Sequence, residues 1–190
     1  MNSAPDNYSK KISKTDDSAA KLLMELLGED PGRNFDVESI FAFKHEDGRW
    51  GWLIFEFLKR ELSNISIEKS HPNRYWKQNS RKFLSLWALK KSLESAGFIS
   101  GLYLVNYDDE RKNVKLIKVR DIDIESKSIW KFEGVETKHI NHVITEDKVM
   151  TFCEFKERFR KFNSDKKGDT WEIIEHIKNR EKISNSDSNR

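Results

Sequence analysis

The pattern of hydrophobic and polar residues in the first half of the chain predicts a helix followed by a β-hairpin. Apolar residues recur at helical spacing over 16–27, and Gly28 ends the helix. Phe35 to Lys44 is rich in β-favouring residues and predicts a strand. Trp50 to Leu58 is almost unbroken apolar, which is typical of a central strand buried on both faces. Asp47-Gly48 lies between these strands, so we expect them to pair antiparallel.

The second half of the chain predicts further helices and strands in mixed order. Pro72 opens the longest helix, over 73–96, which Gly97 ends. Thr151 and Glu154 form a capping box in front of a basic amphipathic helix. The other predicted elements are the strands 101–107, 114–119 and 143–149 and the helix 171–177. This order indicates an α/β fold with a central mixed sheet flanked by helices.

The polar ends of the chain, 1–15 and 178–190, are predicted to be disordered, and residues 16–177 to form one domain. Cys153 is the only cysteine, so no intrachain disulfide can form, and its apolar neighbours predict a small core residue. No window approaches the roughly 20 apolar residues that a membrane span needs. We therefore expect a cytoplasmic protein without a membrane partner. Charged residues make up 35% of the chain with a net charge of +3, which permits local phosphate-binding patches without requiring them.

Glu56 is the first candidate for a functional residue, because it interrupts the most hydrophobic segment of the chain. A buried carboxylate costs several kcal/mol unless it is paired, hydrogen-bonded or bound to a cation. Asp36 lies on the strand predicted to pair with that segment, and Lys59 follows closely. Two carboxylates beside a lysine suit Mg²⁺, with Glu25 of the first helix as a third acid. The alternative is a pair of strand-end acids that reach solvent or meet Arg and Lys partners.

At these residues the chain resembles the PD-(D/E)xK nucleases of the restriction-endonuclease fold. Helix 16–27, Asp36, the stretch Glu56-Phe57-Leu58-Lys59, helix 73–96 and strand 101–107 follow that family's order. The resemblance implies that Asp36, Glu56 and Lys59 are catalytic and that Asp36, Glu56 and Glu25 bind Mg²⁺ or Mn²⁺. Many nucleases of this fold act as dimers, so the resemblance also suggests a homodimer.

The spacing departs from the family, which has one residue between acid and lysine where this chain has two. On a regular strand Glu56 and Lys59 point to opposite faces. Three explanations stay open: a β-bulge near Phe57 or Leu58, transfer of the lysine role to Lys44 or Lys82, or a degraded, inactive site.

Basic residues are interleaved with aromatic ones in the first turns of helix 73–96. They suit a nucleic-acid backbone, or else form the solvated face of an amphipathic helix whose Tyr75, Phe83 and Trp87 belong to the core. The candidate nucleic-acid-binding residues are Arg74, Lys77, Arg81 and Lys82. We expect a metal-dependent DNA endonuclease that hydrolyses phosphodiester bonds with a metal-activated water. The alternative is an inactive module of the same fold that binds nucleic acid or a protein.

Overall fold

The computed structural model describes residues 39–60, 65–108, 110–131, 138–164 and 172–179. All of them belong to the unit formed by residues 37–190. The predicted helix 16–27, with Glu25, and Asp36 lie outside the described residues, as does the N-terminal segment 1–15. No helix in the described ranges is long and apolar enough to cross a membrane.

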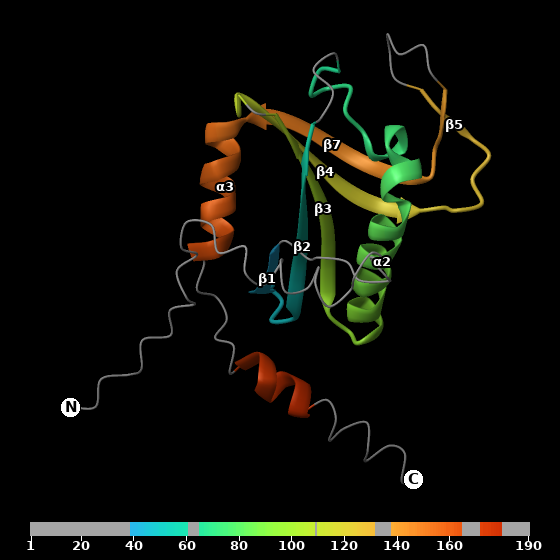
Figure 1. Cartoon of the computed structure of the whole chain (residues 1–190). Coiled ribbons are helices and arrows are strands. Elements are labelled where there is room, and N and C mark those ends of the chain that lie inside the picture. The colour runs from blue at the N-terminus through green and yellow to red at the C-terminus, as the bar shows by residue number, and fades with distance from the viewer. Residues whose placement is uncertain (1–38, 61–64, 109, 132–137, 165–171, 180–190) are drawn as a thin grey trace, which may run out of the picture. The chain divides into compact units, whose positions relative to one another are not determined.

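A five-stranded sheet in the order β1-β2-β3-β4-β7 forms the centre of the fold (Figure 1). The parallel pair is β2 with β3, and the other neighbours are antiparallel. This confirms the predicted α/β class and its mixed sheet. The strands are β1 (Ser39–Lys44), β2 (Trp50–Lys59), β3 (Ile99–Tyr107), β4 (Asn113–Ile122) and β7 (Val143–Thr151).

The hairpin of β1 and β2 forms as predicted. Gly48 adopts the left-handed region, with φ 84°, and its amide donates to the His45 carbonyl oxygen. An ordinary side chain is disfavoured at this φ, which is why Asp-Gly closes the turn. β2 lies between β1 and β3 and buries residues on both faces, as its apolar run predicts.

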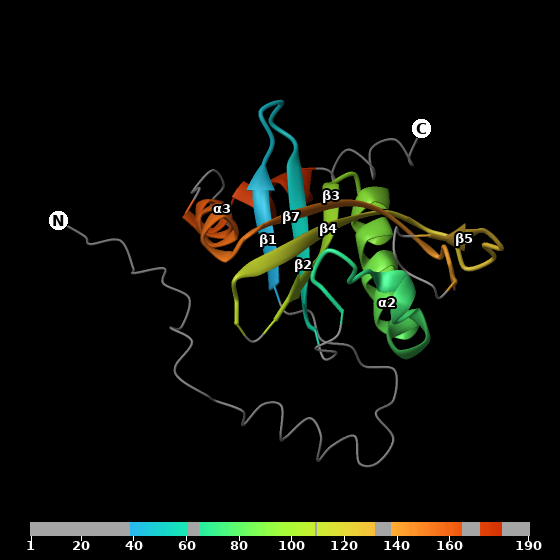
Figure 2. The same cartoon turned by 90° about the horizontal axis from the view of Figure 1, so that it is seen from above.

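Helices cover the two faces of the sheet, as Figure 2 shows. The α2 helix (Trp76–Ser95) packs Phe83 and Leu86 against one face, whereas α3 (Phe152–Ser164) packs Phe155 against the other. Tyr75 and Trp87 also pack against the core on the α2 face, as predicted. Pro72 opens a separate 3-10 turn, η1 (Pro72–Arg74), and α2 begins only at Trp76.

The predicted capping box is present at the start of α3. The Thr151 hydroxyl accepts from the Glu154 amide at 3.2 Å, and the Glu154 carboxylate accepts from the Thr151 amide at 2.8 Å. Cys153 lies inside this box but is exposed, so its prediction as a core residue was wrong. Its apolar neighbours Phe152 and Phe155 turn towards the core because successive helical residues point in different directions.

Two features of the described chain were not predicted from the pattern. Short strands β5 (Ile129–Trp130) and β6 (His139–Ile140) pair beyond the end of the main sheet. The described C-terminal helix covers 172–179, so it includes Lys178 and Asn179, beyond the predicted end at 177. A two-residue strand pair and the last turn of a helix are too short to produce a periodic hydrophobic pattern, so the sequence did not predict them.

Asn73 fastens the η1 turn to the start of β7. Its side-chain nitrogen donates to the Val143 carbonyl at 3.1 Å and to the Asn141 side chain at 2.8 Å, and its oxygen accepts from the Val143 amide at 2.8 Å. Asn73 is buried, so these groups have no water to replace the lost bonds.

We predict that Asn73→Ala lowers the free energy of unfolding by about 2–3 kcal/mol, because it leaves the buried Val143 amide and carbonyl unsatisfied. Urea unfolding followed by circular dichroism measures this. Asn141→Ala is the matched control and should cost about 1 kcal/mol or less, since it removes one bond at a partly buried site. Equal losses in the two variants would contradict the role given to Asn73.

Candidate functional site

Glu56 is fully buried near the end of β2 and lies on the sheet face that α2 covers. It pairs in register with Leu104 of β3, another residue of this face. The side chain therefore points into the layer between sheet and helix. A carboxylate in this layer needs a counter-charge or a cation ligand to offset its loss of hydration.

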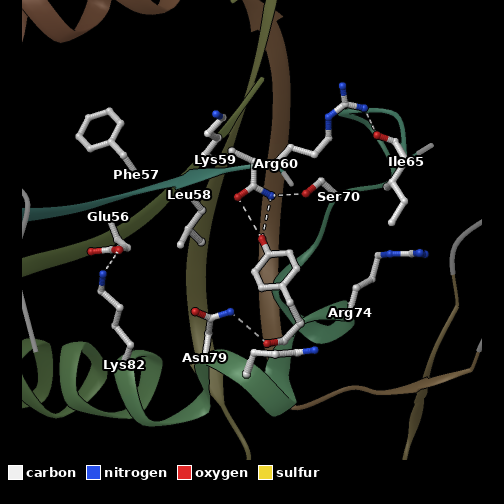
Figure 3. Close-up of a pocket in the computed structure, with 13 residues that line it drawn as sticks. Glu56, Phe57, Leu58, Lys59, Arg60, Ile65, Ser70, Arg74, Asn79 and Lys82 are labelled. Carbon is white, nitrogen blue, oxygen red and sulfur yellow. Dashed lines mark hydrogen bonds and ion pairs between the residues drawn. The ribbon is translucent and has the colours of Figure 1, made fainter. Parts of the chain in front are cut away.

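The counter-charge comes from α2. The Lys82 ammonium forms an ion pair with the Glu56 carboxylate (Figure 3). The Lys82 side chain is 29% exposed, against 1% for Glu56. The pair therefore joins a buried acid to a cation that still reaches solvent. One of the interpretations left open by the sequence, that Lys82 takes the lysine position beside Glu56, agrees with this geometry.

The other two candidate lysines lie elsewhere. β2 and β3 pair without a register shift from Gly51 to Lys59, so no bulge brings Lys59 to the face of Glu56. Lys59 is exposed, and Figure 3 shows its side chain directed away from Glu56. Lys44 pairs with Glu172 at 3.0 Å, at the far end of the hairpin from Glu56. The alternation of strand side chains explains the separation of Glu56 and Lys59.

A cavity of about 700 Å³ opens beside the Glu56–Lys82 pair (Figure 3). Among the described residues, its lining carries the cationic residues Lys59, Arg60, Arg74 and Lys82 and one carboxylate, that of Glu56. Arg60 contacts Asp108 at 3.5 Å, whereas Arg74 makes no ion pair within the described ranges, and its buried Nε has no hydrogen-bond partner there. The cavity is therefore positively charged and suits an anionic ligand.

The wall of the cavity contains a neutral hydrogen-bond network. The Tyr75 hydroxyl donates to the Asn106 side-chain oxygen at 3.0 Å, and the Asn106 nitrogen donates to the Ser70 hydroxyl at 2.8 Å. Burial raises the pKa of Tyr75 above its ordinary value, so the phenol stays protonated. Asn79 of α2 donates to the Tyr75 carbonyl at 3.3 Å. This wall presents polar but uncharged groups.

Lys115 of β4 holds the loop before η1 against the sheet. Its buried ammonium donates to the carbonyl oxygens of Glu68 and Ser70, at 2.8 and 2.9 Å, and pairs with Asp147 at 2.9 Å. His71 follows this loop, contacts Thr145 at 2.9 Å and stacks on Trp130, with ring centroids 4.3 Å apart. These bonds give the cavity a fixed wall on its loop side.

The predicted site residues are only partly gathered at the cavity. Glu56, Lys59, Arg74 and Lys82 line it, whereas Lys77 and Arg81 are exposed on α2 outside it. Asp36 and Glu25 lie outside the described residues. No cluster of three or more His, Cys, Asp or Glu side chains suited to a metal occurs in the described part of the chain.

Sequence reasoning assigned Tyr75 only to the core and missed several other residues that line the cavity: Arg60, Ile65, Ser70, Gln78, Asn79 and Asn106. Arg60 lies in the Lys59-Arg60 pair at the strand exit and was a visible signal. Asn106, a polar residue within an apolar strand, was another. Comparisons with family models, curated proteins and solved structures find no match for this chain.

The pH dependence of the free energy of unfolding tests whether His71 is buried in the wall of the cavity. Burial lowers the pKa of His71 to about 4; Lys115 and His139 act in the same direction and Asp147 opposes them. The unfolded chain therefore binds this proton first as the pH falls from 6.5 towards 4, so the folded state loses stability over that window.

We predict that His71→Asn flattens this dependence, removing about 2 kcal/mol of the parent's loss between about pH 7 and pH 4.5. Urea unfolding at the two pH values measures it. An unchanged slope in His71→Asn would show that His71 is not buried in its neutral form.

Proposed function

We propose that this protein is a metal-dependent phosphodiesterase acting on nucleic acid, with a restriction-endonuclease-like fold and its site at the Glu56–Lys82 pair. The observation that carries the proposal is a buried carboxylate on a central strand, ion-paired with an α2 lysine, at the edge of a positively charged cavity. The order of the hairpin, α2 and the parallel strand β3 supports the proposed fold.

The described residues supply part of the set of oxygen ligands that Mg²⁺ or Mn²⁺ needs. These ions take oxygen ligands and commonly bind through one or two carboxylates together with waters and substrate phosphate oxygens. Glu56 supplies one carboxylate next to the cavity, whereas Asp36 and Glu25, the other acids expected from the sequence, lie outside the described residues. When bound, the ion would lower the pKa of water and neutralise charge on the phosphate.

The protein's own residues would position the substrate and stabilise charge. Lys82, released from Glu56 when a cation takes its place, would donate to a phosphate oxygen as negative charge builds up on it in the transition state. Arg74 would hold the neighbouring phosphate, because its guanidinium is not paired with a carboxylate within the described ranges. The reaction breaks the bond between phosphorus and the leaving oxygen and forms one to the water oxygen.

The second candidate function is a non-catalytic module that binds nucleic acid through the same cavity. The observation in its favour is that Glu56 is the one acid among the described lining residues and already has Lys82 as its partner. A closed ion pair of this kind also serves a purely structural role. The two candidates differ in metal binding and in hydrolysis.

We predict that Lys82→Met and Glu56→Gln each lower Mn²⁺-dependent cleavage of a mixed DNA panel by about 100-fold or more. Lys59→Met should lower it much less, because that side chain lies on the opposite face of β2. Rates with Mg²⁺, Mn²⁺ and EDTA are compared, with circular dichroism as the folding control. If Lys59→Met is as inactive as Lys82→Met, the assignment of the lysine is wrong.

We predict that the Lys82 and Glu56 substitutions change the affinity for Mn²⁺ in opposite directions. Lys82→Met should tighten Mn²⁺ binding several-fold, because the cation that competes for the Glu56 carboxylate is gone, whereas Glu56→Gln should weaken it by about tenfold or more. Calorimetric titration of Mn²⁺ into the full chain measures both. Lys91→Met is the control, since Lys91 pairs with Glu94 at the other end of α2. Absent Mn²⁺ binding and absent cleavage in the parent would favour the non-catalytic module.

A further inference from the structure

We propose that the cavity receives one whole nucleotide of an unpaired strand, so that the site acts on single-stranded nucleic acid and strand ends and not within a closed duplex. This inference rests on the proposed function and adds its substrate class. It follows from the size of the cavity, the distribution of charge along it, and the elements that enclose it.

The size of the cavity is the first observation. Its volume of about 700 Å³ falls within the range of roughly 300–1,000 Å³ that is usual for sites holding a whole small molecule. A single phosphodiester group needs far less space. The lining combines apolar side chains, such as Leu58 and Ile65, with amide and hydroxyl groups. This mixture suits a base and a sugar as well as a phosphate.

The charges lie at two separate ends of this space. Figure 3 shows the Glu56–Lys82 pair at one side and Arg60 and Arg74 at the other, with Ser70 and Asn79 between them. Lys59 also lines the cavity, but its side chain is exposed and directed away from Glu56, and the Ser70 and Asn79 side chains between the two sides are uncharged. A nucleotide within a strand has the same pattern, because its neutral base and sugar are flanked by a phosphate on each side. The two ends of the cavity would bind these two phosphates.

Three elements line the cavity on different sides. The end of β2, the loop that contains Ile65 and Ser70, and the first turns of α2 all contribute to its lining. The loop cannot move aside easily because buried Lys115 holds the carbonyl oxygens of Glu68 and Ser70. A paired nucleotide is stacked on both sides and joined to its partner, so it enters such a space only after leaving the helix.

Gln78 offers a way to fill the cavity without touching the charged groups. It lies exposed on α2 and lines the cavity. Leu84, also exposed on α2, does not line it and serves as the matched control. Both positions face solvent, so a tryptophan there leaves the core packing intact.

The first experiment measures binding to the full chain in EDTA by calorimetry, with three probes: deoxyadenosine 3′,5′-bisphosphate, deoxyadenosine 5′-monophosphate and inorganic phosphate. We expect affinity to fall in that order, with the bisphosphate bound at least about tenfold more tightly than phosphate. Gln78→Trp should weaken both nucleotides by about tenfold and phosphate by less than about twofold. Leu84→Trp should behave as the parent. Equal affinity for the three probes, or nucleotide binding unchanged in Gln78→Trp, overturns the proposal.

The second experiment separates this inference from the proposed function. In Mn²⁺, the parent is given linear single-stranded DNA, covalently closed duplex DNA and bis(p-nitrophenyl) phosphate, with Glu56→Gln as the inactive variant. Cleavage of the single strand at a rate at least about 100-fold above that of the closed duplex supports the inference. Equal cleavage of both DNAs overturns it while the phosphodiesterase stands. Failure to hydrolyse any of the three overturns both.

Discussion

The burial of Glu56 is the constraint on which the arrangement of the site depends. A carboxylate on a central strand has no access to water, so the protein or a ligand must neutralise it. Lys82 does so from α2, which ties the end of β2 to the first half of that helix. Lys82 keeps part of its side chain in solvent, so the pair joins the core to the cavity. The same interaction therefore neutralises a buried charge and positions both groups at the edge of the cavity.

The cavity lies between the end of β2 and the first turns of α2. β2 continues to Lys59, whereas α2 begins only at Trp76, and the described part of the chain between them, residues 65–75, which we call the return segment, contributes Ile65, Ser70, Arg74 and Tyr75 to the lining. Buried polar bonds from Lys115 and Asn73 fix this return segment in place. Such bonds cost little when every group is satisfied, and they give a unique position that apolar packing alone does not specify. The wall of the site is thus part of the core.

Charge and shape together define the proposed chemistry. The fold brings Lys82 to one side of a concave space and Arg60 and Arg74 to the other, with the Ser70 hydroxyl and the Asn79 amide between them. Fold alone does not determine function, and the comparisons offer no relative from which to transfer one. We therefore base the proposal of a phosphodiesterase for unpaired strands on this distribution of groups, with Glu56 and Lys82 at the reacting end.

The sequence by itself determined the features that depend on neighbouring residues. The β1–β2 hairpin, the burial of β2 and the capping box of α3 follow from local pattern and turn chemistry. Alternation predicted that Glu56 and Lys59 face apart only on a regular strand, and the unshifted register of β2 and β3 shows that the strand is regular there. Only the tertiary structure decided which lysine meets Glu56, that the return segment closes a cavity, and that Cys153 is exposed. The physical reason is that periodicity sets the direction of a side chain along its own element, whereas its partner depends on how distant elements pack.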